Sequence, residues 1–395
     1  MRYLLAPDSF KESATALQVA QAMRRGILAA DPTAETRLMP LSDGGEGLTV
    51  TLTHATGGTM REVTAHDALG QPIIARYGFL GDAATAADQR TDASSEYGAS
   101  PRTAVIELAE ASGLEAIPPT ERRPLEASTL GTGEIMAAAI EAGAERIILG
   151  LGGSATTDGG TGLARALGYR FLDREGRELP PGGGDLIRLE RIDDAHVNPL
   201  TRRIPVILAS DVTNPLTGPT GAAQVFAPQK GATSMQVERL DAGLAHLADA
   251  IERFNGRRVH DRPGAGAAGG TGAGLLGLFE AQIMPGIELV LDMVHGRQAC
   301  EWADLVITGE DSIDAQTPHG KVPAGIARLA HACGTPAIAV GGRVTRDPHV
   351  LAQLRQAGIK AAFPIAPGPA ELEDLLRDVE INVETTCAAI AGLLN

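Results

Sequence analysis

The feature that most constrains the fold is a glycine-rich segment, residues 149–162, which lies between a short apolar run and a helical pattern. Residues 146–151 are mostly branched and apolar, as in a buried strand. Beyond the glycines, Leu163, Ala164 and Leu167 have helical spacing. A strand that passes through a turn into a helix is typical of α/β proteins, so the segment predicts an α/β fold.

The same segment has the composition of an anion-binding loop. Glycines let backbone N–H groups approach a ligand without obstruction by Cβ. A loop that leads into a helix N-terminus also suits a phosphate. A tight strand-to-helix turn with Ser and Thr caps explains such a loop equally well on its own, so the choice depends on the rest of the chain.

Length and charge exclude several classes of protein. A chain of 395 residues predicts two domains or one large α/β body. Its formal net charge of −15, with no basic block, excludes nucleic acid as an expected partner. No apolar run approaches the length of a membrane span, and the N-terminus enters a strand directly. The three cysteines have no metal or disulfide spacing. We therefore expect a cytoplasmic protein that does not contact membranes.

The order of the expected elements predicts the domain arrangement. A β-α-β opening and three apolar runs in the last third indicate one Rossmann-like domain with a parallel sheet formed by both chain ends. Alternating segments after Gly57 indicate hairpins in an inserted mixed-sheet α/β domain. We expect the boundaries 1–58 and 287–395 for the first domain and 59–286 for the second, which carries the glycine-rich loop. Residues 81–100 are polar and predict a mobile surface excursion.

Four acids directly follow apolar runs that we expect to be strands: Asp8, Asp43, Asp211 and Glu310. In open α/β sheets the ligand lies outside the carboxyl ends of the strands, so these acids are expected to converge on one site. Helix capping is the alternative for any one of them. Clustered carboxylates, a few lysines and glycine loops are what phosphoryl transfer requires.

Lysine is scarce, and its positions support the same interpretation. Only four of the 34 basic residues are lysine: Lys11, Lys230, Lys321 and Lys360. The first three lie within motifs where a compact ammonium group is of use. The alternative is a codon bias toward arginine that has left a few lysines by chance. This alternative explains Lys360 well.

Each of three other motifs has two interpretations from the sequence. Residues 264–269 match a dinucleotide-binding template, which would suit an oxidoreductase, but the segment before them is a poor strand and a packing loop is the better default. Residues 308–323 hold acids and a lysine in a short loop before a helix, as a metal and nucleotide clamp or as an acidic cap. Residues 229–233 suit either a small carboxylate or a surface turn.

Taken together and in this order, the motifs resemble those of the bacterial glycerate kinases of the first structural class. The matching stretches are residues 6–13, 42–47, 149–162, 211–215, 229–232, 264–274 and 308–323. The resemblance implies ATP- and Mg²⁺-dependent transfer of the γ-phosphoryl group to D-glycerate, usually giving the 2-phosphate, with the active cleft between two α/β domains. The alternatives are a kinase that gives 3-phosphoglycerate and a non-catalytic protein that binds a small hydroxy acid. The expected assembly is a monomer or a homodimer.

The resemblance also implies roles for individual residues. An acid would act as base for the glycerate hydroxyl, and Lys11 or Lys230 would bind the glycerate carboxylate. The chain departs from the family's pattern at Asp311 and Ser312, where a glycine and a basic or amide residue are common. The expected site residues are, for catalysis, Lys11, Asp43 and Asp211; for the substrate, Asp8, Ser9, Asn214, Gln229 and Lys230; for the nucleotide, Gly152, Gly153, Ser154, Thr157, Asp158, Gly160 and Lys321; and for the metal, Glu310 and Asp314.

Overall fold

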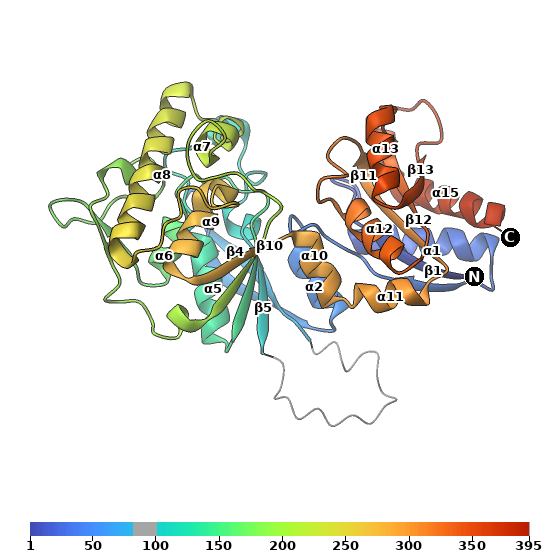
Figure 1. The fold of residues 1–395 in the computed structure, drawn as a ribbon, viewed down its shortest axis with the longest axis horizontal. Helices are drawn as coiled ribbons and strands as arrows, with labels where there is room; N and C mark the ends of the chain where they lie inside the picture. Colours follow the sequence, from blue (N-terminus) through green and yellow to red (C-terminus); the bar gives the residue numbers. More distant parts are fainter. Residues whose placement is uncertain (82–100, 395) are drawn as a thin grey trace. The chain divides into compact units, whose positions relative to one another are not determined.

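Both ends of the chain contribute strands to one parallel sheet in the computed structural model, which describes residues 1–81 and 101–394 (Figure 1). The strand order is β13-β12-β11-β1-β2, and each neighbouring pair is parallel. This confirms the parallel sheet predicted from the apolar runs at the two ends of the sequence. The strands are β1 Arg2–Pro7, β2 Glu35–Leu38, β11 Leu305–Ile313, β12 Ala337–Val344 and β13 Ile359–Pro364.

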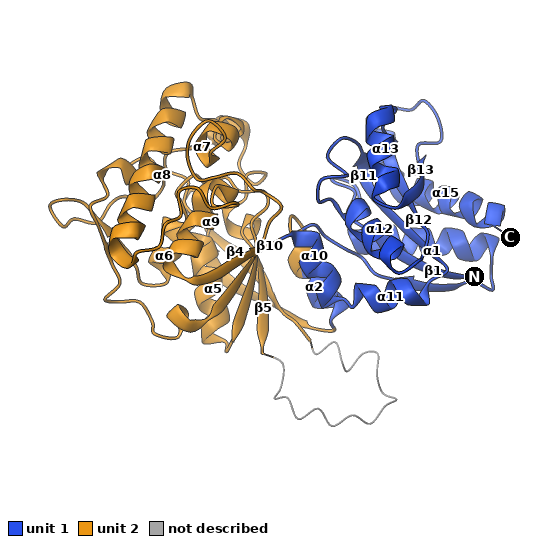
Figure 2. Ribbon diagram, viewed as in Figure 1, with its two compact units in different colours: residues 1–43, 50–56, 285–395 blue, residues 44–49, 57–284 orange. Residues whose placement is uncertain are grey.

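The sheet belongs to unit 1, which comprises residues 1–43, 50–56 and 285–395 (Figure 2). Tyr3 and Leu5 of β1 are buried in one cluster with Met23 of helix α1 and Val383 of helix α15. Because side chains alternate along a strand, Leu4 faces the opposite side, where α11 and α12 contact β1. The helices of this unit are α1 Ala16–Ala30, α10 Gly286–Met293, α11 Gly296–Trp302, α12 Val322–Ala332, α13 Pro348–Gln356, α14 Leu372–Arg377 and α15 Val379–Leu394, and α2 Leu48–Ala55 belongs partly to each unit.

Strand β1 marks the point where the order of this sheet reverses. From β1 the chain passes through α1 to β2 on one side, whereas β11, β12 and β13 follow one another on the other side. The carboxyl ends of β1 and β11 therefore form the topological switch point, where open α/β sheets bind their ligands. Helix α1 starts at a capping box formed by Thr15 and Gln18, which fixes where the chain leaves this end of the sheet.

Unit 2, residues 44–49 and 57–284, contains a mixed sheet with the order β10-β9-β6-β5-β4-β3 (Figure 2). The first four strands are parallel, whereas β4 pairs antiparallel with both β5 and β3, which confirms the predicted hairpin. The strands are β3 Thr59–His66, β4 Pro72–Phe79, β5 Thr103–Glu107, β6 Arg146–Gly150, β9 Pro205–Ala209 and β10 Glu280–Met284, with a separate pair β7 Arg170–Leu172 and β8 Arg191–Asp193.

The helices of unit 2 build a second hydrophobic core. Met136 of α5, Leu163 of α6 and Leu244 of α8 are buried in one cluster with Leu149 of β6 and Leu208 of β9. The helices are α4 Ala109–Ser112, α5 Leu130–Glu141, α6 Thr161–Ala166, α7 Ala222–Phe226, α8 Ser234–Asn255 and α9 Ala267–Leu278. Within the described ranges no helix has both the length and the apolar character to cross a membrane.

One segment predicted as a loop is a strand. Strand β11 continues through Ile313, so Glu310, Asp311 and Ser312 lie within it. Pairing with β12 accounts for the difference, because Glu310 lies opposite Gly341 and Ser312 opposite Arg343. Glu310 and Ser312 therefore face the same side of the sheet, and Asp311 faces the other. Beyond Gly81, the excursion expected over residues 81–100 lies outside the described residues.

Candidate active site

The first group of expected site residues lies at the switch point of unit 1. Asp8 directly follows β1, and Glu310 lies in the neighbouring strand β11. The chain after β2 continues along β1, where the Leu41 N–H donates to the Pro7 carbonyl at 2.9 Å. Asp43 follows two residues later. The fold thus brings acids from distant parts of the sequence to the end of one sheet.

Each of these carboxylates accepts a hydrogen bond from a neighbour. Lys321, which was expected at the nucleotide, is paired with an acid of this cluster in unit 1. The bonds are Lys321 Nζ to Asp43 Oδ2 at 2.8 Å, Ser9 N to Asp8 Oδ1 at 2.7 Å and Thr317 Oγ1 to Glu310 Oε1 at 2.6 Å.

The cluster holds more carboxylates than its one ammonium group offsets. Burial, and then the charge of Asp43, raise the pKa of Asp8 well above its usual range. Burial, with the charges of Asp311 and Asp43 nearby, raises the pKa of Glu310 to about 7. Burial alone would lower the pKa of Lys321, but the charge and hydrogen bond of Asp43 outweigh it and the pKa is raised. Such a site attracts a further cation.

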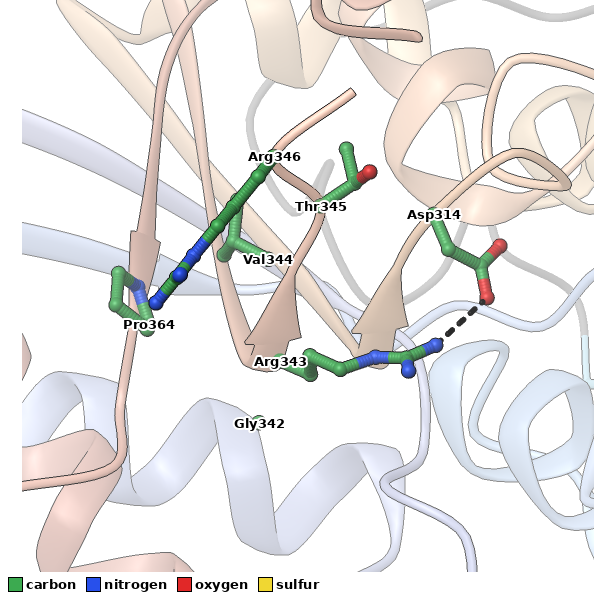
Figure 3. A pocket seen from close by; sticks show the side chains of 7 residues that line it. All are labelled: Asp314, Gly342, Arg343, Val344, Thr345, Arg346 and Pro364. Carbon is green, nitrogen blue, oxygen red and sulfur yellow. Dashed lines mark ion pairs between the residues drawn. The ribbon is translucent and has the colours of Figure 1, made fainter. Parts of the chain in front are cut away.

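The carboxylate oxygens of this cluster fit a Mg²⁺ ion that is also bound by a ligand. Mg²⁺ prefers oxygen ligands and is usually bound by one or two carboxylates together with water and phosphates. Among the described residues, no group of three His, Cys, Asp or Glu side chains could hold a metal ion by itself. Asp314, expected beside Glu310 as a ligand, has its Oδ2 3.6 Å from a guanidinium nitrogen of Arg343 (Figure 3).

Lys11 lies in the segment that joins β1 to α1. Phe10 is buried and exchanges backbone hydrogen bonds with Ala14, which holds the segment in a tight turn. Glu12 has a φ of 59°, in the left-handed region that non-glycine residues rarely adopt. Lys11 is exposed at this turn, and its ammonium group makes no hydrogen bond or ion pair within the described part of the chain. It is therefore available to an anionic ligand.

The glycine-rich loop connects β6 to α6 in unit 2. The amide N–H groups of Gly152 and Gly153 make no hydrogen bond within the ranges that the structure describes, and both residues are accessible. A Cβ on Gly152 would come within 2.8 Å of the Cα atom of Gly45. Gly153 has a φ of 69°, which favours glycine. These two amides are therefore accessible to an anionic ligand.

Asp158 organises the rest of this loop from within. Its side chain is fully buried, and Oδ2 accepts hydrogen bonds from the Thr129 amide at 2.9 Å and the Thr129 hydroxyl at 2.8 Å. The amides of Gly160 and Gly162 donate to Oδ1 and Oδ2, each at 3.1 Å. Asp158 therefore takes the place that an anion would have at the start of α6, and Gly160 is committed to it.

Lys230 supports the same loop. Its side chain is buried, and Nζ donates to Ser154 Oγ at 2.8 Å and to the Thr156 carbonyl at 2.6 Å. Burial lowers the pKa of Lys230 to about 7, although the charge of Asp158 opposes the shift. The hydroxyls of Thr156 and Thr157 are buried without a hydrogen-bond partner among the described residues. Lys230 Nζ thus contacts the loop, and its expected binding of a substrate carboxylate stays a prediction.

The stability of unit 2 is expected to depend on pH through Lys230. An unfolded lysine keeps its proton to about pH 10.5, whereas the folded one releases it near 7, so unfolding takes up a proton between these values. Stability that Lys230 contributes should therefore rise with pH from 7 to 10.5. Urea unfolding of the wild type and Lys230→Met at about pH 6.5 to 9.5 should show a growing advantage of the wild type. Lys360 is exposed, so Lys360→Met should differ from the wild type in free energy of unfolding by the same amount at every pH. If Lys230→Met also differed by a constant amount, Lys230 would not cause the pH dependence.

The remaining expected residues lie near the ends of β9 and of α7. Asp211 is exposed just after β9, the strand beside β6. The Asn214 side chain donates to the Thr220 carbonyl at 2.9 Å and so closes its own loop. Gln229 is exposed, and its carbonyl accepts a hydrogen bond from Arg122. Of these three, Asp211 is the one placed at the carboxyl end of a strand of the sheet.

Sequence reasoning missed one partly buried acid. Glu107 is the last residue of β5, and its carboxylate accepts hydrogen bonds from the Gly47 amide at 2.9 Å and the Thr49 amide at 2.7 Å. Burial raises the pKa of Glu107, although these bonds oppose the shift. The pattern that singled out the four other acids, an acid at the end of an apolar run, also applies here. Glu107 fixes the start of α2.

Residues 264–269, which match the dinucleotide template, form a turn and the irregular start of α9, where Ala268 and Gly269 have non-helical backbone angles. The residues before them form a turn and not a strand. A Cβ on Gly266 would overlap the carbonyl of Pro215, and one on Gly269 would overlap that of Thr156. The glycines therefore allow close backbone contacts inside unit 2.

Comparisons with known proteins agree along the whole chain. Residues 3–395 match the Glycerate kinase family. A glycerate kinase of Bacillus subtilis is 44% identical over 99% of this chain and 97% of its own, and a glycerate 2-kinase of Escherichia coli is 39% identical over 100% and 98%. A crystal structure from Salmonella typhimurium LT2, provisionally named glycerate kinase 2, matches with a TM-score of 0.85 and 42% identity, covering 100% of this chain and 98% of that one.

Proposed function

The chain belongs to the glycerate kinase family, and we propose that it phosphorylates D-glycerate at the 2-hydroxyl, with Mg²⁺ as cofactor. It is a phosphotransferase, with glycerate and ATP as its substrates. The full-length similarity to a protein named glycerate 2-kinase is the observation that supports the 2-position. The acids and Lys321 at the switch point are the chemical groups that such a transfer needs.

In this proposal the acids of unit 1 have different roles. Asp43 accepts the proton of the attacking hydroxyl, because its carboxylate is held in place by Lys321 and lies at the switch point. Glu310 and the neighbouring Asp8 hold the metal ion, which when bound offsets negative charge on the phosphates. Lys321 supplies a fixed positive charge beside them. Asp314, whose Oδ1 accepts a hydrogen bond from the Gln316 amide at 2.8 Å, is given no metal contact in this proposal.

The glycine-rich loop is proposed to bind a phosphate group through its backbone. The amides of Gly152 and Gly153 donate to its oxygens. The Ser154 hydroxyl accepts from Lys230, which leaves its own O–H free to donate. Asp158 and Lys230 act as positioning residues, because their contacts are with the loop itself. Asp211, just after β9, is assigned the catalytic role in this proposal that its sequence motif suggests.

Lys11 is proposed to bind the carboxylate of glycerate. Lys11→Ala is expected to raise KM for glycerate at least about tenfold, since a charge-assisted hydrogen bond is worth about 1.5–3 kcal/mol. The thermal midpoint should not change, because Lys11 is exposed. Steady-state kinetics with each substrate varied separately measures this, with Lys360→Ala as the matched control. A Lys11→Ala variant with full kcat/KM would show that Lys11 does not bind the glycerate carboxylate.

A ³¹P NMR spectrum of the protein with ATP, Mg²⁺ and D-glycerate tests the whole proposal. A resonance of 2-phosphoglycerate is the expected result. A resonance of 3-phosphoglycerate would keep the kinase and overturn the 2-position. Intact ATP and no new resonance, together with measurable glycerate binding, would favour a protein that binds the acid without turning it over.

A further inference from the structure

A pocket of about 590 Å³ lies at the carboxyl ends of β12 and β13 in unit 1 (Figure 3). Its volume is within the range of small-molecule sites, about 300–1,000 Å³. It is lined by Asp314, Gly342, Arg343, Val344, Thr345, Arg346 and Pro364. Asp314 belongs to the motif of residues 308–323, but the roles proposed above do not account for the pocket.

The charge of the lining favours an anion. Arg343 and Arg346 are both exposed guanidinium groups, and Arg346 makes no hydrogen bond or ion pair among the described residues. Arg343 is held weakly, with Nε 3.3 Å from Ser312 Oγ and a nitrogen 3.6 Å from Asp314. Asp314 is the one carboxylate among the described residues of the lining. A guanidinium group binds phosphate in a bidentate manner and also stacks on planar rings.

The shape of the lining adds an apolar wall. Figure 3 shows Arg346 extending past Val344 toward Pro364, whereas Arg343 extends toward Asp314. Val344 and Pro364 give one side of the pocket an apolar surface, and the Thr345 hydroxyl is the further polar side chain. This combination of planar cations and apolar side chains suits a nucleobase joined to a phosphate.

The pocket lies next to the acid cluster on the same sheet. Arg343 is opposite Ser312 in the pairing of β12 with β11, and Glu310 is two residues before Ser312. At about 3.3 Å per residue and about 4.8 Å between strands, the backbones of Arg343 and Glu310 are separated by less than about 10 Å. One ligand can therefore reach from the pocket to the acids at the switch point.

We propose that this pocket binds the nucleoside end of ATP, with Arg343 and Arg346 contacting the base and the first phosphate. The proposal rests on the kinase function above. It places the β- and γ-phosphates of ATP toward Glu310 and Asp8. ATP is then anchored on unit 1 by its adenosine end. Inorganic phosphate or phosphoglycerate would present the same kind of anionic group to these arginines.

Titration calorimetry with ADP and the Arg343→Ala/Arg346→Ala double variant tests the proposal. We expect the Kd for ADP and the KM for ATP to rise at least about tenfold, with KM for glycerate changed less than about twofold. AMP should compete with ADP on the wild type. The exposed Arg24 of α1, changed to Ala, is the matched control and should leave all three constants unchanged.

An unchanged Kd for ADP in the double variant would overturn the pocket assignment. If the same variant also lost affinity for inorganic phosphate or phosphoglycerate, the pocket would be a site for those anions. The assay separates this from the proposed function, because ADP binding is measured without glycerate: a wild type that binds ADP through these arginines but does not phosphorylate glycerate would contradict only the function.

Discussion

Asp43→Asn is expected to lower kcat about 10³-fold while the protein stays folded. A general base contributes about 10²–10⁴-fold to a rate, and an asparagine cannot accept the hydroxyl proton. The fold should tolerate the change, because the amide oxygen can still accept the hydrogen bond that Lys321 now donates to Asp43. Steady-state kinetics at saturating ATP and glycerate measures the loss.

A second effect of this variant is independent of turnover. The charge of Asp43 raises the pKa values of Asp8 and Glu310, so its removal should lower both, including the pKa of about 7 of Glu310. Carboxyl NMR titration of the variant would detect the shift. Glu46→Gln, at an exposed position three residues later, is the control and should keep full activity. A kcat for Asp43→Asn within about tenfold of the wild type would exclude Asp43 as the base.

Much of the fold could be predicted because its strands are buried on both faces. Apolar runs at 2–6, 146–151 and 305–308 are the starts of β1, β6 and β11, and both ends of the chain form one sheet. The length of β11 could not be predicted, because its last residues are polar and are held by pairing with β12. Long-range pairing of this kind leaves no mark on the local hydrophobic pattern.

The sequence predicted that acids distant along the chain meet at one sheet end, but it did not predict the direction of each side chain. The motif order identified Asp8, Asp43 and Glu310, which the fold brings to one sheet end. It could not distinguish a lysine that faces a ligand from one that supports a loop. Lys230 is such a support, and its burial depends on the packing of α7 and the glycine-rich loop. Local sequence does not contain that information.

Asp158→Ala is expected to cause a large loss of stability. The substitution leaves the amide and hydroxyl of Thr129 and the amides of Gly160 and Gly162 without their acceptor in a buried site. Each buried unsatisfied group costs about 1–3 kcal/mol, so we expect the free energy of unfolding to fall by at least about 3 kcal/mol. For a unit of this size the thermal midpoint should drop by about 10 °C, as calorimetry would measure.

Asp158→Asn separates the hydrogen bonds from the bulk of the side chain. Its amide oxygen can replace Oδ2, which accepts three of the four bonds, so only the Gly160 amide should meet an NH₂ group. We therefore expect a loss well below that of Asp158→Ala. Asp261→Ala removes an exposed acid paired with Arg258 and should change the midpoint little. If Asp158→Ala melted like the Asp261 control, the loop would not depend on this carboxylate, and Asp158 would instead be available to the substrate side of the reaction.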